Sequence, residues 1–118
     1  MQILTFLHTA IIVTDLEKAE HFYSDVLGLV KIDRVLKYPG AWYQIGDNQL
    51  HLIVDVDAPK QPKHEKWGRN PHVAFSVSDL DAAKKQLSHY NFPFQLSASG
   101  RSAIFTQDPD GNTIELSA

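Results

Sequence analysis

Four side chains of types that bind divalent metal ions are spread along the 118-residue chain, namely His8, His51, His72 and Glu115. Imidazole nitrogens and carboxylate oxygens are common ligands of zinc, nickel, cobalt, manganese and iron. The chain contains no cysteine, so a metal site must use histidine, carboxylate or water, and a thiolate nucleophile is excluded. These residue types predict Lewis-acid chemistry, in which a bound ion polarises a carbonyl group while a nearby base moves a proton.

The four residues are related by a repeat. When the chain is aligned on itself with a shift of 64 residues and no gap, His8 falls on His72 and His51 falls on Glu115. The same shift superposes further identical pairs, such as Asp15 with Asp79, Leu16 with Leu80 and Asn48 with Asn112. We therefore predict two copies of one module, at residues 1–56 and 71–118, within a single domain.

Each copy has the pattern of a strand, a helix and three further strands. In the first copy Asp15 is a good N-cap, Gly28 is a good C-terminal stop, and apolar residues recur at helical spacing between them. Strands are expected at residues 8–13, 29–36, 41–45 and 49–54 of the first copy, and the second copy has a strand at 72–77, an Asp79-capped helix and a hairpin turn at 108–112. The pattern predicts an α+β fold of two tandem βαβββ modules, joined by a surface linker at residues 57–70.

The repeat also predicts that the four ligand-type side chains converge. If the modules pack about a pseudo-twofold axis, equivalent residues face each other across it. His51 and Glu115 each lie between two apolar residues, so they point to the opposite sheet face from those neighbours. We expect the apolar neighbours to pack under the helices and the four ligands to line one cleft around a single ion.

Composition limits the possible partners. The net charge of −3, the isoelectric point near 6.0 and the dispersed basic residues argue against nucleic acid. No apolar stretch approaches the roughly 18 residues of a membrane-spanning helix, and the apolar residues 3–13 lack the basic start of a secretory signal. The absence of cysteine suits a reducing compartment. We therefore expect a cytoplasmic protein that acts on a small molecule.

The remaining charged and histidine side chains give weaker signals. Three histidines fall outside the repeat and are expected to be solvated: His21, His64 and His89. Three basic side chains could bind an anion but are expected to be scattered surface charges: Arg34, Lys37 and Arg101.

The sequence resembles the vicinal oxygen chelate superfamily, the group of glyoxalases, bleomycin resistance proteins and extradiol dioxygenases. The resemblance covers nearly the whole chain, from His8 to Leu116. It is carried by Val13-Thr14-Asp15-Leu16, Phe22-Tyr23, Val26-Leu27-Gly28-Leu29, Leu50-His51-Leu52, His72 with Ala74-Phe75, and Asp108-Pro109-Asp110-Gly111-Asn112 before Ile114-Glu115-Leu116. It implies a half-barrel of paired βαβββ modules around a divalent ion that chelates adjacent oxygens of a substrate.

By position, the resemblance makes His8, His72 and Glu115 the usual three metal ligands. His51 stands where many lactoylglutathione lyases have a glutamate, which argues against the glutathione-specific reaction. We expect Glu115 to act as the catalytic base if it can leave the metal, and His51 otherwise. The aromatic side chains of Tyr38, Trp42 and Tyr43 are expected on the substrate side.

Three classes of function follow from the resemblance. The first is a lyase or isomerase that uses nickel, zinc, cobalt or manganese. The second is a dioxygenase with His8, His72 and Glu115 as a facial triad on Fe(II). The third is a metal-free protein that sequesters a drug. Many relatives are homodimers, so we also predict a homodimer, with the metal site within one chain or shared across the interface.

Overall fold

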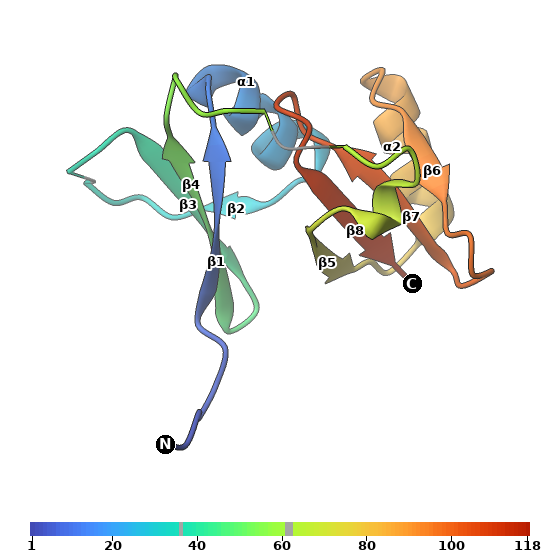
Figure 1. Cartoon of the computed structure of the whole chain (residues 1–118), viewed down its shortest axis with the longest axis horizontal. Coiled ribbons are helices and arrows are strands. Elements are labelled where there is room, and N and C mark those ends of the chain that lie inside the picture. The colour runs from blue at the N-terminus through green and yellow to red at the C-terminus, as the bar shows by residue number, and fades with distance from the viewer. Residues whose placement is uncertain (36, 61–62) are drawn as a thin grey trace. The chain divides into compact units, whose positions relative to one another are not determined.

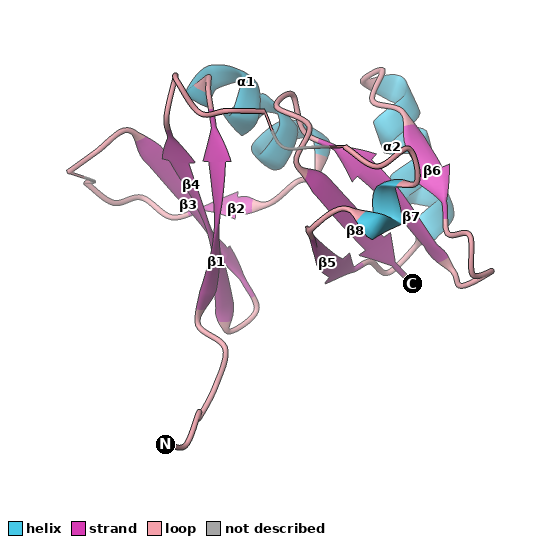
Figure 2. Ribbon diagram, viewed as in Figure 1, coloured by secondary structure: helices cyan, strands magenta, loops and turns pink. Residues whose placement is uncertain are grey.

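The computed structural model describes residues 1–35, 37–60 and 63–118, and the chain forms two compact units, Met1–Ala58 and Pro59–Ala118 (Figure 1). Each unit contains one four-stranded sheet and one helical segment between the first and second strands of that sheet (Figure 2). The strand order is β1-β4-β3-β2 in unit 1 and β5-β8-β7-β6 in unit 2, so the sheets have the same topology. The predicted α+β fold of two tandem βαβββ modules is confirmed.

The strands of the two sheets also pair in the same directions. The first and last strands of each unit are parallel, and the other neighbours are antiparallel. The strands of unit 1 are β1 (His8–Val13), β2 (Val30–Lys31), β3 (Gly40–Ile45) and β4 (Asn48–Val54). Those of unit 2 are β5 (His72–Ser76), β6 (Phe94–Leu96), β7 (Ala103–Gln107) and β8 (Thr113–Ser117).

The strand predicted at residues 29–36 is much shorter than expected. Only Val30 and Lys31 pair with β3, and one further bond runs from the Ile32 backbone N–H to the Trp42 carbonyl. The apolar alternation that suggested a longer strand has no buried face to fill, since Val30 and Val35 are both exposed. Leu36, the last residue of the predicted strand, lies outside the described residues.

The helical segment of unit 1 is not the single α-helix that the sequence predicts. Asp15 caps α1 (Leu16–Glu20) by accepting the Lys18 N–H, but the helix continues as a π-helix, η1 (His21–Val26). There the Leu27 N–H donates to the Phe22 carbonyl, five residues back instead of four. In unit 2, α2 (Leu80–His89) is an ordinary α-helix capped by Asp79.

The π-helix shows that structurally equivalent residues of the two units are not all 64 positions apart, as the gap-free alignment assumes. Both helical segments end at a left-handed residue, Gly28 (φ 72°) in unit 1 and Asn91 (φ 63°) in unit 2, and these two residues are 63 positions apart instead of 64. In the sheets Trp42 lies opposite His51 and Phe105 lies opposite Glu115, which again gives a spacing of 63 for β3 and β7. Unit 1 therefore has one extra residue in its helix, and unit 2 has one extra residue in its last hairpin turn. The two differences cancel in the sequence.

One face of each sheet packs against the helical segment of its own unit. Tyr23 from η1 contacts Tyr43 from β3, and Leu50 and Leu52 of β4 are fully buried. In unit 2, Leu87 of α2 is buried together with Ile104 and Ile114. Because strand residues alternate between faces, the opposite face of each sheet, called the open face below, carries the predicted ligands.

Part of the predicted linker belongs to the fold of unit 2. The short 3₁₀ helix η2 (Trp67–Arg69) packs on β7 and β8, with Gly68 against the ring of Phe105. The side chain of Gln95 accepts the Trp67 N–H and donates to the Glu65 carbonyl. Residues 63–70 are thus attached to the sheet, whereas residues 61–62 of the predicted linker lie outside the described part of the chain. No described helix has the length and apolar character needed to cross a membrane.

Candidate functional site

The predicted ligands of unit 1 are stacked ring on ring on its open face. The rings of His8 and His51 have centroids 4.1 Å apart with an angle of 19° between their planes. On its other face the His51 ring stacks on Trp42, with centroids 3.7 Å apart and an angle of 7°. The guanidinium carbon of Arg34 lies 3.9 Å from the Trp42 centroid. These contacts form a four-layer stack in the order Arg34, Trp42, His51, His8.

A chain of side-chain hydrogen bonds determines which nitrogen of His51 carries the proton. The Gln44 amide donates to the carbonyls of Gly46 and Asn48, so its oxygen faces Gln49. The Gln49 amide donates to that oxygen and presents its own oxygen 2.8 Å from His51 Nε2. Nε2 is therefore the donor and Nδ1 has the free lone pair. Burial lowers the pKa of His51, and the neighbouring His8 and Arg34 act in the same direction, so the ring is neutral at neutral pH.

The predicted ligands of unit 2 face each other directly. His72 Nε2 lies 3.3 Å from Glu115 Oε1, while His72 Nδ1 is 2.7 Å from the Asn70 carbonyl oxygen. A carbonyl can only accept, so Nδ1 carries a proton and fixes the orientation of the ring. A proton on Nε2 makes this contact an ion pair, and a divalent cation between Nε2 and the carboxylate oxygen would satisfy the same two atoms.

Two further groups hold the Glu115 carboxylate in place. Ser117 Oγ donates to Oε2 at 2.6 Å, and Arg101 Nη2 donates to Oε1 at 3.3 Å. The Ser117 hydrogen bond is the main cause of a lowered pKa of Glu115; burial opposes it, and Arg101 and His72 add to it. The carboxylate is therefore ionised at neutral pH, which is the form that binds a cation.

The unit 2 pair fits a metal ion well. Two ligands about 2 Å from one ion at a tetrahedral angle are roughly 3.3 Å apart, which matches the separation of His72 Nε2 and Glu115 Oε1. Metal-binding histidines usually donate their second nitrogen to a carbonyl or carboxylate, as His72 does to Asn70. The chemistry of the pair and its surroundings therefore agree with a divalent metal.

The unit 1 pair fits an ion through only one of its rings. An imidazole binds a metal in its own ring plane, and two nearly parallel planes 4.1 Å apart have no common point about 2 Å from both rings. His51 is fixed between two rings and bonded to Gln49, whereas His8 is the exposed outer layer of the stack. His8 is thus the better ligand of the two. Within the described ranges, no three His, Asp or Glu side chains are grouped to hold one ion.

Comparison with known proteins identifies the family of the chain. The profile of the Glyoxalase/Bleomycin resistance protein/Dioxygenase superfamily matches residues 5–116. The chain belongs to this superfamily. Methylmalonyl-CoA epimerase from mouse mitochondria is 30% identical over 92% of this chain and 70% of its own length, and the uncharacterized protein YaeR of Escherichia coli is 30% identical over 92% of both. The lactoylglutathione lyase structure from Agrobacterium tumefaciens has a TM-score of 0.68 at 22% identity, over 95% of this chain and 91% of that one.

The three aromatic residues that we expected on the substrate side do not lie on one face of the sheet. Tyr43 is fully buried on the helix side of the sheet, and its hydroxyl lies 2.8 Å from Ser24 Oγ. Burial raises the pKa of Tyr43, so the phenol stays protonated. Tyr43 is therefore a core residue, and its expected place on the substrate side is wrong. Trp42 lies on the open face, and Tyr38 is partly exposed beside it.

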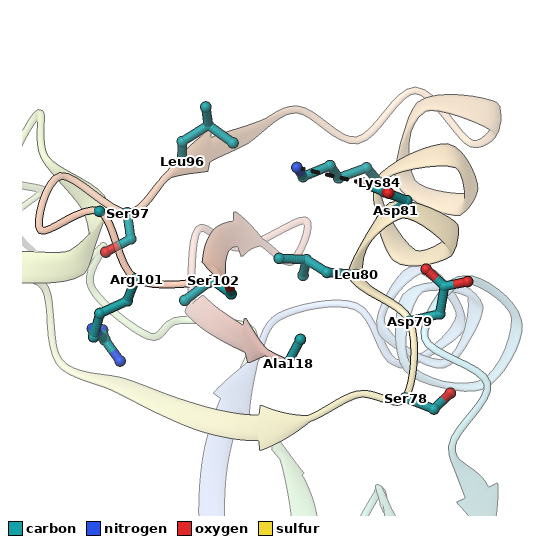
Figure 3. A pocket seen from close by; sticks show the side chains of 12 residues that line it. Ser78, Asp79, Leu80, Asp81, Lys84, Leu96, Ser97, Arg101, Ser102 and Ala118 are labelled. Atoms are coloured by element: carbon teal, nitrogen blue, oxygen red, sulfur yellow. Dashed lines mark ion pairs between the residues drawn. The ribbon is translucent and has the colours of Figure 1, made fainter.

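Two cavities of the described residues differ in their relation to the candidate ligands. A cavity of about 240 Å³ in unit 1 is lined by residues that include Arg34, Tyr38 and Trp42. A cavity of about 640 Å³ in unit 2 lies at the start of α2 (Figure 3), where Asp79 caps the helix and Lys84 pairs with Asp81. The Arg101 side chain is directed away from these α2 residues (Figure 3), and its guanidinium binds Glu115. The larger cavity therefore contains none of the four candidate ligands.

The residues around the candidate ligands were not predicted. Gln49 lies two positions before His51, and Ser117 lies two positions after Glu115, so strand alternation places each on the same face as its partner. That signal was present in the sequence. The contact between Arg101 and Glu115 joins a loop to a strand, and no local pattern reveals it. The other histidines, His21, His64 and His89, are exposed as expected, although His21 is 3.0 Å from Asp25.

Proposed function

We propose that the protein is a divalent-metal-dependent lyase or isomerase that moves a proton beside a carbonyl group of a small substrate. The observation that carries this proposal is the His72–Glu115 pair, whose nitrogen and carboxylate oxygen lie 3.3 Å apart, the separation of two ligands of one metal ion. The pair lies in a chain of the glyoxalase superfamily, and the relatives of this chain include a methylmalonyl-CoA epimerase.

His72 and Glu115 would bind the ion in unit 2, and the sequence repeat predicts His8 as a further ligand. When bound, the ion would supply Lewis-acid stabilisation of negative charge on two adjacent substrate oxygens. Asn70 and Ser117 hold the two unit 2 ligands in the orientation needed for binding. The predicted fourth ligand, His51, is left out because its ring is stacked on His8.

His51 is the better candidate for the catalytic base. Its ring is neutral, Gln49 fixes the proton on Nε2, and Nδ1 has a free lone pair with which to accept a proton. Glu115 has three partners on its two oxygens, and its lowered pKa makes it a weak proton acceptor. In this proposal Glu115 binds the metal and His51 moves the proton.

A second candidate is an Fe(II)-dependent dioxygenase. The set of two histidines and one carboxylate that remains after His51 is left out is the facial triad typical of such enzymes. The name of the mouse relative favours an isomerase over a lyase or an oxygenase at 30% identity. The identity of the bound metal separates these alternatives, because iron would favour the dioxygenase.

The metal content of the purified protein tests the proposal. The protein without a metal-binding tag should contain, or take up on reconstitution, about one divalent ion per chain by elemental mass spectrometry. His72→Ala and Glu115→Ala should lose this ion, and His89→Ala, which removes an exposed histidine of α2, should keep it. A parent protein that binds no metal, or ligand variants that retain it, would contradict the proposal and favour a metal-free binding protein.

A further inference from the structure

We propose that the 240 Å³ cavity of unit 1 binds the anionic group of the substrate, a carboxylate or a phosphate. The inference rests on the proposed function and adds a charge class to its substrate. Anion binding to this cavity can nevertheless be measured in the absence of metal, so the two proposals can fail separately.

The cavity has hydrogen-bond donors without acceptors. The Arg34 guanidinium carbon lies over the Trp42 ring, and no described residue accepts a hydrogen bond from the guanidinium or forms an ion pair with it. Trp42 also lines the cavity, and its indole Nε1 is buried without a hydrogen-bond partner. An anion in the cavity would supply the acceptor atoms that the Arg34 guanidinium lacks.

The charge of the cavity wall favours the same kind of ligand. Two basic side chains, Lys31 and Arg34, line the cavity, and its described wall contains no Asp or Glu. Lys31 already pairs with Glu20 at 3.0 Å, so Arg34 supplies the positive charge of the cavity wall that has no partner among the described residues. A guanidinium presents five N–H donors in a plane that matches the two oxygens of a carboxylate or phosphate.

The size and position of the cavity limit the substrate further. Its volume corresponds to roughly eight water molecules at about 30 Å³ each, enough for an anionic group with a short carbon chain. Trp42 separates the guanidinium from His51, with which it stacks at 3.7 Å on its other face. An anion at Arg34 thus lies one ring away from the proposed base, which favours a small organic acid or phosphate ester.

The structure distinguishes Arg34 from the two other basic residues considered with it. Arg101 donates to Glu115 and belongs to the metal-binding pair. Lys37 is exposed and is absent from the cavity wall, although it lies only three positions from Arg34. Lys37→Gln therefore removes the same charge from the same loop without changing the cavity, and it is the matched control for Arg34→Gln.

Tryptophan fluorescence of the metal-free protein tests the inference. The chain has two tryptophans, so Trp67→Phe leaves Trp42 as the only reporter. Inorganic phosphate and acetate are titrated separately into the EDTA-treated, dialysed protein at constant ionic strength, with chloride as the balancing anion. We expect a saturable change with at least one of the two anions, and the anion that binds more tightly identifies the preferred group.

The variants decide whether the cavity is responsible. Arg34→Gln should weaken binding of the anion by fivefold or more, and Lys37→Gln should change it by less than twofold. Thermal melts of each variant confirm that it is folded at the titration temperature. No saturable change with either anion in the parent protein would overturn the inference. Equal weakening in the two variants would also overturn it, because it would indicate a general effect of charge.

Discussion

The two units hold their candidate residues at equivalent places of equivalent sheets, but by different interactions. In unit 1, His51 is held between the rings of His8 and Trp42, and it stays neutral. In unit 2, Glu115 is held by Ser117, Arg101 and His72, and it stays ionised. One backbone design therefore holds a neutral imidazole in one copy and an ionised carboxylate in the other.

The aromatic residue next to each pair shows how the same position takes different roles. Trp42 and Phe105 occupy equivalent places in β3 and β7, opposite His51 and Glu115. Trp42 stacks flat on His51, whereas Phe105 meets the His72 ring edge-on, at 5.4 Å and 82°. The strand register determines the position and the sheet face of a side chain, and the neighbouring side chains determine its protonation and its contacts.

The largest effect is expected from Glu115→Gln, which keeps the shape of the side chain but removes its charge. Removing a side chain that only hydrogen-bonds a metal ligand weakens metal binding about 10–100-fold. Removing the charge of the ligand itself should therefore weaken metal binding by more than about 100-fold. A competition titration with a chelator measures the affinity. Asp110→Asn, an equivalent change in the β7–β8 turn, should leave the affinity unchanged. An unaltered affinity in Glu115→Gln would mean that the unit 2 pair is not the metal site.

His51→Phe should slow proton transfer without loss of metal, because the proposed base lies in unit 1 and the metal-binding pair in unit 2. Phenylalanine keeps a flat ring between His8 and Trp42 but cannot accept a proton, and general base catalysis contributes about 100-fold or more to a rate. Once a substrate is identified, its exchange of a proton with deuterated solvent, followed by NMR, should slow by at least that factor at unchanged metal content. Loss of metal in this variant would instead make His51 a ligand.

A smaller effect is expected from Ser117→Ala, which removes the 2.6 Å hydrogen bond to Glu115. Metal affinity should fall about 10-fold, because the carboxylate loses the group that orients it. Ser88→Ala, a change of the same kind at an exposed position of α2, serves as the control and should have no effect on the affinity. An effect of Ser117→Ala as large as that of Glu115→Gln would indicate a change in the fold, which circular dichroism would detect.

The smallest effect is expected in the pH dependence of the free energy of unfolding of the metal-free protein. This free energy should fall in two pH ranges, an upper window and a lower window. The pKa of His51 is lowered on folding, so its protonation opposes folding, and this contribution to stability is lost as the pH falls below about 6.5. The pKa of Glu115 is also lowered, and its contribution is lost only below about 4.5. Urea unfolding across this range should show the upper window weakened in His51→Phe and the lower one weakened in Ser117→Ala. Identical pH profiles in all three proteins would contradict both assignments.

The repeat was sufficient to predict the two βαβββ modules and the equivalent positions of their candidate residues. Identical residues such as Asp15 and Asp79 mark the same N-cap in both modules, and His8 and His72 mark the same strand start. A one-residue shift in a strand turns every side chain to the other face, so such matches carry strong information on register. The convergence of both pairs on one ion stays a prediction.

Two errors of the sequence analysis have physical causes. Trp42 and Tyr43 are adjacent in β3, so they cannot share a face, and Tyr43 is on the face of the buried Ala41. The rule was available and would have separated them. The π-helix was not predictable in this way, because the adjacent apolar residues Phe22 and Tyr23 are equally compatible with α-helical and π-helical spacing.

The extra residue in η1 also limits how the two halves of the gene could recombine. A crossover before the helix and another after the last hairpin would exchange segments that carry both one-residue differences or neither of them. A crossover between η1 and β3, guided by the gap-free alignment, would change the segment between the helix and β3 by one residue and leave the pairing of the following hairpin unchanged, because both of its strands come from one copy. Chimeras of either kind should therefore keep the strand pairing of the hairpins.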